Sequence, residues 1–394
     1  MPKRILIFSI AYLPFVGGAE LAIKEITDRI NDIQFDMITL RFNSKLPKFE
    51  KVSNVNVHRI GFTKSNPAIA DLVRLPLKIN KFLFPLTACW KACQMHRKNK
   101  YDGIWAIMAA FAGFSAVFFK ITHPQVPYLL TLQEGDPIGY ILNKVKLIRP
   151  VFKMIFTRAN FIQAISNYLA DWARAMGFKG ELEVVPNAVA IAHFSQKYSK
   201  EELDDLKQKL DKMSDDKFVI TTSRLVFKNA IDDVIKALPI LPVNIKFLIL
   251  GTGPDEIRLK NLVKELKVEN RVIFYGHADH KDMPKFLKIS DVFIRPSLSE
   301  GLGSSFLEAM AVGLPVIGTP VGGIVDFLID GQTGLFCQVG NPESIAQKIK
   351  QILNDNQLRQ RLIENGKKLV REKYDWDSIA QNMQAIFLKM LVSS

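Results

Sequence analysis

Short apolar segments alternate with helix-like segments along the chain, and they do so in two successive series. In the first series, strands are expected at residues 4–10, 35–40, 55–60, 101–107, 127–133, 159–166 and 181–189, and helices at 19–30 and 167–178. A polar, charge-dense run over residues 195–216 ends this series, and a second follows with strands in KFVITTS, KFLILG, RVIFYG and DVFIRPS. Such alternation is typical of mostly parallel sheets with helices on both faces. The sequence therefore predicts an α/β protein of two doubly wound domains, with ligands at the carboxyl ends of the strands.

Length and cysteine content are compatible with this architecture. The chain has 394 residues, which is enough for two domains with separate cores, and its 48% hydrophobic and 23% charged residues are typical of globular proteins. Its three cysteines, Cys89, Cys93 and Cys337, have neither the paired spacing of a zinc site nor the pattern of a disulfide framework. A reducing cytoplasm is the expected setting.

Positive charge is concentrated in the first half of the chain. Residues 1–194 contain 25 Lys and Arg against 13 Asp and Glu, whereas residues 195–394 contain 28 against 26. No acidic residue lies between positions 71 and 102, or between 136 and 171, although both stretches carry several basic and apolar residues. This combination is typical of helices that lie on an anionic membrane. The alternative is a set of core-facing helices with a solvated basic side. We expect peripheral, reversible contact with an anionic membrane.

Two apolar segments resemble membrane-targeting sequences. Residues 5–13 follow basic residues, as in a signal peptide, and residues 103–119 reach the lower length limit of a membrane span. We interpret the first as a buried parallel strand leading into a glycine turn. We interpret the second as a strand over residues 103–107 and a buried helix over 111–120, because both then fit the surrounding alternation.

A glycine-rich loop follows the strand DVFIRPS and opens a helix expected at residues 304–312. The backbone N–H groups and the positive helix end at such a junction can hold a phosphate. Two carboxylates frame the loop, Glu300 within it and Glu308 in the helix. In an alternative interpretation, Ser305 and Glu308 form a capping box and Glu300 is an ordinary loop acid.

Two cations follow the first strand of the second series. Arg224 and Lys228 lie between KFVITTS and the next helix, where a bidentate guanidinium and an ammonium suit a pyrophosphate. In isolation, the same spacing also occurs on solvated helix faces. Gly17 and Gly18 form a small-residue turn after the first strand of the chain. The sequence has no G-x-x-x-x-G-K-[ST] loop, no His/Cys metal cluster and no aromatic–basic nucleic-acid motif.

The order of these segments resembles that of the retaining glycosyltransferases of family 4. The matching segments are PFVGGAE, AISNYLADWARAMGF, VVPNAVAIAHF, SRLVFKN, LGTGP, VIFYGHAD and SEGLGSSFLEAMAVGLPVIGTPVGGIVDFLIDGQTGLF. The E-x7-E pair of that family falls on Glu300 and Glu308. The resemblance implies a GT-B fold with two Rossmann-like domains facing across a cleft. Residues 1–190 would bind the acceptor and residues 191–375 the nucleotide sugar, and a C-terminal helix, residues 376–394, would pack back on the first domain.

The resemblance also implies roles for the matching residues. Arg224, Lys228 and Glu300 are the implied catalytic residues: the two cations bind the donor's diphosphate and stabilise it as it leaves, and Glu300 contacts the donor sugar. Glu308 is expected to contact the ribose. Donor contacts are also implied for Gly18, Gly276, His277, Gly303 and Ser304, with Gly276 and His277 beside the base and backbone amides around Gly303 and Ser304 holding sugar and phosphate. No metal or cofactor is expected.

One position departs from the family pattern. Many members carry a histidine beside the reacting sugar where this chain has Gln133, which is followed by Glu134 and Asp136. A base is not required if the leaving diphosphate takes the acceptor's proton. We therefore hypothesise that Glu134 or Asp136 orients the acceptor through hydrogen bonds to its hydroxyl groups.

The sequence thus predicts an enzyme that transfers a sugar from a UDP- or GDP-linked donor to an acceptor hydroxyl with anomeric retention. The basic, apolar first domain indicates a lipid-linked glycan or surface polysaccharide precursor as acceptor, at the inner face of the cell membrane. The alternatives are a sugar-nucleotide epimerase or phosphorylase of the same architecture, and a non-catalytic glycosyltransferase-like subunit. A nucleic-acid partner is not expected, because it would not explain Arg224, Lys228 and the two acids together.

Overall fold

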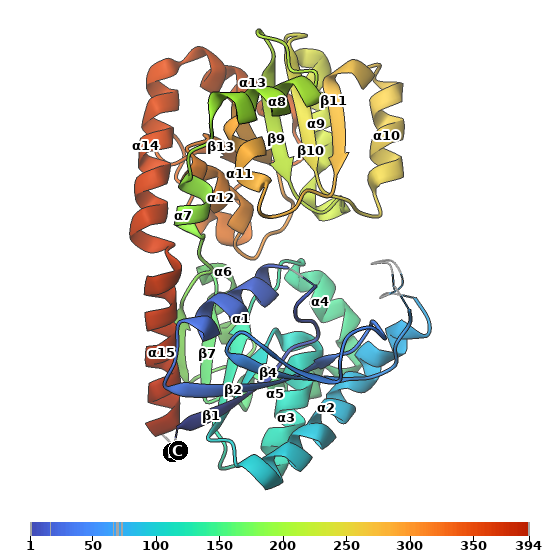
Figure 1. Ribbon diagram of the computed structural model, residues 1–394, viewed down its shortest axis with the longest axis vertical. Helices are drawn as coiled ribbons and strands as arrows, with labels where there is room; N and C mark the ends of the chain where they lie inside the picture. The colour runs from blue at the N-terminus through green and yellow to red at the C-terminus, as the bar shows by residue number, and fades with distance from the viewer. Residues whose placement is uncertain (1, 16, 66, 68–70, 72–73, 393–394) are drawn as a thin grey trace. The chain divides into compact units, whose positions relative to one another are not determined.

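The computed structural model describes residues 2–15, 17–65, 67, 71 and 74–392, and these form two compact units (Figure 1). The first unit comprises the residues up to Asn187 together with those from Trp376 onward, and the second comprises Ala188–Asp375.

The first unit is built on an eight-stranded sheet in the order β3-β4-β2-β1-β5-β6-β7-β8. Its strands are β1 (Lys3–Phe8), β2 (Ile33–Leu40), β3 (Phe49–Val52), β4 (Val55–Ile60), β5 (Gly103–Ile107), β6 (Tyr128–Leu132), β7 (Phe161–Ala164) and β8 (Glu181–Val184). All pairs are parallel except β3 with β4. The central strands β5, β6 and β7 are buried along their whole length, as expected for a sheet that is covered on both faces.

Helices cover both faces of this sheet. They are α1 (Gly18–Asp28), α2 (Leu77–Asn99), α3 (Phe114–Thr122), α4 (Ile138–Lys144), α5 (Arg149–Thr157), α6 (Asn167–Ala175) and α15 (Trp376–Val392). Figure 1 shows α2, α3 and α5 together on one side of the sheet, and α15 packs beside α1. The ring of Phe387 in α15 lies 5.8 Å from that of Phe35 and 5.0 Å from that of Trp105, so this last helix contributes to the core of the first unit.

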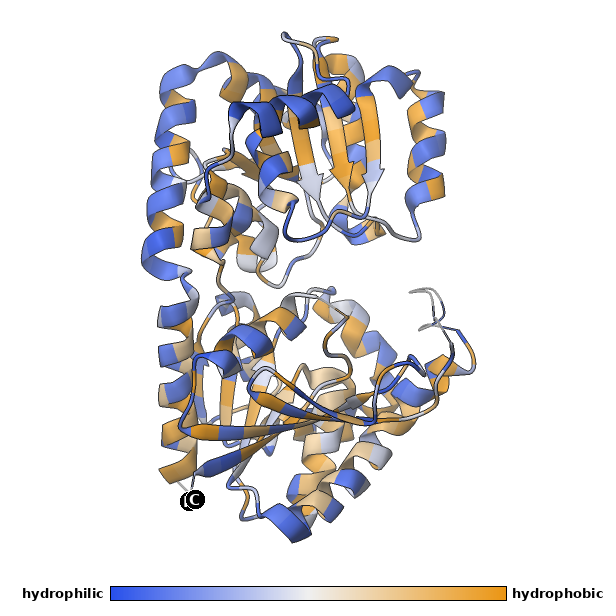
Figure 2. Ribbon diagram, viewed as in Figure 1, coloured by the Kyte–Doolittle hydropathy of each residue, from blue (hydrophilic) through white to orange (hydrophobic). Residues whose placement is uncertain are grey.

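The second unit contains a six-stranded parallel sheet in the order β11-β10-β9-β12-β13-β14. Its strands are β9 (Lys217–Thr222), β10 (Ile245–Leu250), β11 (Val272–Gly276), β12 (Val292–Arg295), β13 (Val316–Gly318) and β14 (Leu335–Phe336). Its helices are α7 (Ile191–Ser195), α8 (Lys200–Lys209), α9 (Ile231–Ala237), α10 (Glu256–Glu265), α11 (Met283–Lys288), α12 (Ser304–Val312), α13 (Pro342–Asn354) and α14 (Asn356–Lys373). Figure 2 shows β9 and β10 as strongly apolar, whereas α14 is mostly hydrophilic.

The chain enters and leaves the second unit at neighbouring positions. Val189, just after the entry, donates its backbone N–H to the carbonyl of Tyr374 at 3.0 Å, and it forms an isolated parallel bridge with Asp375. The second unit is therefore an insertion in the first, and its two ends are hydrogen-bonded to each other.

Most of the predicted elements are confirmed, but several elements were not predicted, α8 and β3 among them. Residues 103–119 form strand β5, a tight turn over Ala109–Gly113 and helix α3, as interpreted, although the helix begins three residues later than expected. The predicted polar break over residues 195–216 contains helix α8, and the edge strand β3 was not predicted. Within the part of the chain that the structure describes, no helix has both the length and the apolar character needed to cross a bilayer.

Helix α2 has an exposed apolar face, which we call the α2 stripe. The stripe consists of Ile79, Phe82, Leu83, Leu86 and Trp90, whose exposed fractions lie between 39% and 65%. The spacing of three to four residues aligns these side chains along one side of the helix. Other apolar side chains of α2, including Phe84 and Ala88, are buried, so the core-facing alternative holds for only one side of the helix.

Part of the second acid-free stretch is also exposed, although Phe152 and Phe156 in α5 are buried. No residue of α4 is buried, and Leu147 in the turn that follows is 96% exposed. Tyr140 is half exposed, and the ammonium of Lys144 lies 4.1 Å from the centroid of its ring. The first unit therefore has two exposed regions in which apolar and basic side chains are mixed.

Candidate functional site

The second unit has its topological switch point between β9 and β12. From β9 the chain proceeds outward to β10 and β11, and it then returns to place β12 on the other side of β9. Ligands of doubly wound sheets bind outside the carboxyl ends of the strands at this point. The loop after β9 carries Arg224 and Lys228, and the loop after β12 carries Glu300. The two loops are joined by the backbone N–H of Leu298, which donates to the carbonyl of Lys228 at 2.7 Å.

A buried asparagine organises the loop after β9. Asn229 is 5% exposed, and its side-chain amide donates to the carbonyl of Arg224 at 2.7 Å. Arg224 itself is exposed, while Lys228 lies in a short helical turn over Phe227–Asn229. Because Asn229 bonds to the backbone of Arg224, it fixes the turn that presents both cations.

Glu300 is held by two donors. One of its carboxylate oxygens accepts from the guanidinium Nη2 of Arg295, and the other accepts from the backbone N–H of Gly301 at 3.1 Å. Its own carbonyl accepts from the N–H of Gly323 at 3.1 Å, and a Cβ at Gly322 would lie 1.9 Å from that carbonyl oxygen. The loop over Gly322 therefore fits against Glu300 only if residue 322 has no side chain.

Helix α12 begins after a residue in the left-handed region. Gly303 has φ +100°, which favours glycine, and Ser304 is the first helical residue. The capping-box interpretation of Ser305 and Glu308 is wrong, because no side chain caps this helix and the Ser305 hydroxyl accepts from Arg295 at 2.9 Å. Without a side-chain cap, the positive end of α12 is suited to an anion.

Glu308 lies beside a histidine from another loop. Its Oε1 is 3.7 Å from Nε2 of His280, and its side chain is 17% exposed. The ring of His280 stacks on that of His193 at 5.2 Å. Of the residues predicted beside the base, Gly276 ends β11 with φ +84°, and the side chain of His277 is 80% exposed.

In the first unit, Gln133 and Gly18 are linked through Asn187. The switch point of this sheet lies between β1 and β5, and Gly18 opens the helix after β1. Gln133 follows the neighbouring strand β6, is 9% exposed, and accepts from the side-chain amide of Asn187 at 3.1 Å. A Cβ at Gly18 would lie 3.9 Å from the same amide nitrogen.

The carboxylate of Glu134 accepts hydrogen bonds from the backbone inside the first unit. Its two oxygens accept from the backbone N–H groups of Ala109 at 2.6 Å and Gln133 at 3.0 Å. Burial raises the pKa of Glu134 from 4.5 to about 7, although these backbone hydrogen bonds oppose the rise. The adjacent turn contains two non-glycine residues with positive φ, Met108 at 70° and Phe111 at 57°. Each such residue costs about 1–3 kcal/mol, so Glu134 helps to hold a strained turn.

Of the two carboxylates proposed for the acceptor, Asp136 is therefore the exposed one. Glu134 is 7% exposed, and its oxygens already face backbone donors. The geometry thus favours Asp136 over Glu134 for contact with a hydroxyl group of a substrate.

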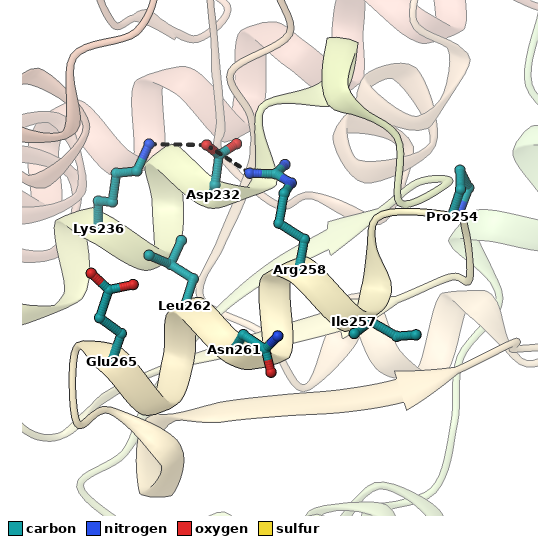
Figure 3. A pocket seen from close by; sticks show the side chains of 8 residues that line it. All are labelled: Asp232, Lys236, Pro254, Ile257, Arg258, Asn261, Leu262 and Glu265. Carbon is teal, nitrogen blue, oxygen red and sulfur yellow. Dashed lines mark hydrogen bonds and ion pairs between the residues drawn. The ribbon is translucent and has the colours of Figure 1, made fainter.

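A shallow groove lies elsewhere in the second unit, between α9 and α10 (Figure 3). Asp232, Lys236, Arg258 and Glu265 are among its lining residues, and Asp232 is paired with both Lys236 and Arg258. None of the residues predicted from the sequence lines this groove.

Three polar residues of the two sites were not predicted from the sequence, namely Arg295, Asn229 and Asn187. Arg295 left one signal, because it is the only charged residue after Asp291 in the strand segment DVFIRPS. Asn229 and Asn187 stand in the matching segments SRLVFKN and VVPNAVAIAHF, but those segments do not indicate the carbonyl or amide group that the fold brings to each.

Residues 203–369 match the family model described as glycosyl transferases group 1. An uncharacterized glycosyltransferase of Methanocaldococcus jannaschii is 27% identical over 395 residues, which covers 95% of this chain and 96% of the relative. The lipopolysaccharide core biosynthesis glycosyltransferase LpsE of Rhizobium meliloti is 32% identical over 225 residues, or 57% of this chain and 62% of LpsE.

A solved structure has a similar fold. Anabaena HepE in complex with UDP-glucose matches with a TM-score of 0.79 at 21% identity, over 98% of this chain and 99% of HepE. At this level of identity the similarity concerns the fold, and it confirms the predicted two-domain α/β class.

Proposed function

Because residues 203–369 match the family model of the group 1 glycosyl transferases, we propose that the chain moves a sugar from a nucleotide diphosphate sugar to an acceptor hydroxyl with anomeric retention. Its fold is of the GT-B type. The observation that carries the proposal is the junction of two loops at the switch point. There the backbone bond from Leu298 to Lys228 joins the loop of Arg224 and Lys228 to the loop of Glu300.

The proposed catalysis is electrostatic. As the bond between the sugar and the diphosphate breaks, negative charge develops on the leaving phosphate oxygen. Arg224, Lys228 and the N-terminus of α12 at Ser304 would stabilise that charge. The acceptor hydroxyl attacks the anomeric carbon from the same face and passes its proton to the leaving phosphate oxygen. Closure of the site would exclude water and limit hydrolysis of the donor.

The proposed reaction uses no metal, since the two cations and the helix end supply positive charge. We expect turnover to be unchanged after EDTA treatment and dialysis. Restoration of lost activity by Mg²⁺ or Mn²⁺ would contradict this part of the proposal.

The donor is proposed to be UDP- or GDP-linked, with UDP-glucose as the first candidate because HepE, whose fold is similar, was solved with it. Glu308 would bind the ribose, and Gly276 and His277 would lie beside the base. The 3.7 Å approach of His280 to Glu308 keeps that carboxylate next to the loop that follows β11.

The acceptor is proposed to be a lipid-linked glycan or another precursor of a surface polysaccharide. Relatives in this family include a glycosyltransferase of lipopolysaccharide core biosynthesis. In the first unit, Gln133 and the exposed Asp136 lie at the carboxyl end of β6, where an acceptor hydroxyl would be received.

We further propose that the first unit contacts the anionic inner face of the cell membrane. The α2 stripe exposes Phe82, Leu86 and Trp90, and the acid-free sequence around it supplies cations that complement acidic lipid headgroups. The exposed α4 region adds Leu147 and Tyr140 with neighbouring lysines. A lipid-linked acceptor would then reach the enzyme by diffusion in the membrane plane.

A thermal-shift screen over nucleotide sugars tests the main proposal, because a ligand that binds the folded state raises the apparent Tm. We expect selective stabilisation by one base and one sugar, followed by sugar transfer when acceptor lipids are added. Interconversion of the nucleotide sugar without an acceptor would indicate an epimerase. Binding without any turnover would indicate a non-catalytic subunit. No binding of any nucleotide sugar would contradict the proposal.

A further inference from the structure

Arg295 is a buried cation at the donor side of the second unit. It is the last residue of β12 and is 8% exposed, although a guanidinium is strongly disfavoured away from water unless it is paired. Its neighbours in the strand, Phe293 and Ile294, are fully buried apolar residues. A charge at this position therefore requires specific partners.

Those partners all belong to the loop and helix that follow. Nη2 donates to Glu300, and Nη1 donates to the Ser305 hydroxyl at 2.9 Å. The guanidinium carbon lies 5.1 Å from the centroid of the Phe306 ring. Gly303 leaves room for this group, since a Cβ there would lie 3.3 Å from Nη2. The guanidinium is thus packed beneath the loop that runs from Glu300 to Ser305.

This arrangement fixes the direction of the Glu300 carboxylate. Arg295 donates to one carboxylate oxygen and the N–H of Gly301 donates to the other, so both oxygens of the carboxylate are held in direction. A carboxylate oxygen can accept more than one hydrogen bond. The free lone pairs of Glu300 can therefore still receive hydroxyl groups, in an orientation that Arg295 sets.

We propose that Arg295 is a positioning residue for the donor sugar and acts through Glu300. The inference rests on the proposed function, in which Glu300 contacts the sugar. Through Ser305, Arg295 also ties this carboxylate to the first turn of α12, where the phosphate would bind. The diphosphate is proposed to bind Arg224, Lys228 and the backbone N–H groups at the start of α12, whereas Arg295 bonds to the side chain of Ser305 and not to those N–H groups. Loss of Arg295 therefore weakens recognition of the sugar and leaves recognition of the nucleoside diphosphate intact.

Titration calorimetry with UDP and UDP-glucose tests this separation in the wild type and in Arg295→Met and Arg295→Lys. Should the nucleotide screen select another sugar nucleotide, that compound and its nucleoside diphosphate replace the pair. We expect Arg295→Met to bind UDP like the wild type and UDP-glucose about 10- to 100-fold more weakly, as for loss of a charge-assisted hydrogen bond. Arg295→Lys should recover part of this loss, because an ammonium can still donate to Glu300.

Arg271→Met is the matched control. The guanidinium of Arg271 donates to the backbone carbonyls of Leu238, Leu241, Pro242 and Ile245 in the same unit, which is a purely structural set of contacts. We expect it to lower Tm without changing the ratio of the UDP and UDP-glucose affinities.

Two results for the single variant Arg295→Met would overturn the inference about Arg295. One is an equal loss of UDP and UDP-glucose affinity in Arg295→Met, and the other is no loss of either. A wild-type protein that binds neither compound, nor any other nucleotide sugar, would contradict the proposed function instead. Additive effects of Arg295→Met and Glu300→Ala on UDP-glucose affinity would also exclude action through Glu300, since residues that act together are non-additive.

Discussion

Single side chains at the switch point of the second unit carry the proposed chemistry. Arg224 is exposed, but its backbone is held by the buried Asn229, so its guanidinium is presented from a fixed turn. Preorganised charge of this kind stabilises a transition state without reorganising at the moment of reaction. The proposed reaction is therefore expected to be most sensitive to substitution of these individual side chains.

Replacing Arg224 by Ala should lower kcat by about 10²–10³, the scale of losing one donor to a developing oxyanion. Turnover is measured with the donor and acceptor found by the screen. Arg258→Ala is the control, because Arg258 is an arginine of the same unit that lies in the groove between α9 and α10. Equal turnover in Arg224→Ala and Arg258→Ala would remove Arg224 from the mechanism.

Glu134 should make the stability of the first unit depend on pH. Its pKa is raised by burial from 4.5 to about 7, so between these values the folded chain keeps a proton that the unfolded chain releases. The associated stability is complete below pH 4.5 and declines as pH rises toward 7, by about 3 kcal/mol in total. Urea unfolding of Glu134→Gln on both sides of this range should lack the decline. Asp136→Asn should retain most of it, because the charge of Asp136 makes the smallest of the contributions to the pKa of Glu134 and burial makes the largest.

The roles of residues in linear motifs could be predicted from the sequence. The roles of residues that act through contacts made by the fold could not. Glu300, Arg224 and Lys228 were identified because each stands in a recognisable segment. The hydrogen bond from Asn229 to the Arg224 carbonyl depends on how the chain turns, which residue type does not specify. The internal role of Glu134 was missed for the same reason, since its donor Ala109 lies on a different loop.

Helix α2 exposes more apolar surface than is usual for a helix that packs on a sheet. A helix that packs on a sheet normally has one apolar side, but α2 buries Phe84 and Ala88 and still exposes the α2 stripe. The ammonium of Lys78 lies 6.0 Å from the ring of Phe82, so charge and apolar surface adjoin directly. Such a combination is suited to the boundary between headgroups and acyl chains.

Substitution of Phe82 and Trp90 by Ser should reduce binding to anionic vesicles about tenfold or more, because each ring contributes buried apolar area. Vesicle flotation with anionic and with neutral lipids measures this. Ile257→Ser, which removes a 76% exposed apolar side chain from α10 of the second unit, is the control. Equal recovery of the wild type with both lipids would exclude the electrostatic contribution.

At this scale the strands β5, β6, β7 and β12 are readable in the sequence because they are buried along their whole length. The edge strand β3 lacks this signal, since Phe49 is 56% exposed and its neighbours are polar. Helix α8 was hidden in a charged run, although its capping box, Ser199 with Glu202, is readable in the sequence. The strained turn at Phe111 depends on contacts with Glu134 that no local pattern encodes.

At the scale of the whole molecule, helix α15 joins the end of the chain to the core of the first unit. It follows the second unit in the sequence but contributes Phe387, which is fully buried, to the core of the first. Phe387→Ala should therefore lower the free energy of unfolding of the first unit by about 3–5 kcal/mol. In limited proteolysis of this variant, the first unit should be cleaved before the second. Leu388→Ala, at a 46% exposed position, should have little effect. Cleavage confined to the second unit of Phe387→Ala would contradict this assignment.

The hydrogen-bonded pair of chain crossings, Val189 with Tyr374, makes the second unit a module that recombination can exchange. Because its two ends are neighbours, residues 188–375 could be replaced by the corresponding segment of a relative with two adjacent junctions and no new linker. Under the proposed assignment of the donor to the second unit, a chimera of this kind should take its sugar preference from the graft, which a donor screen of the host, the relative and the chimera would check.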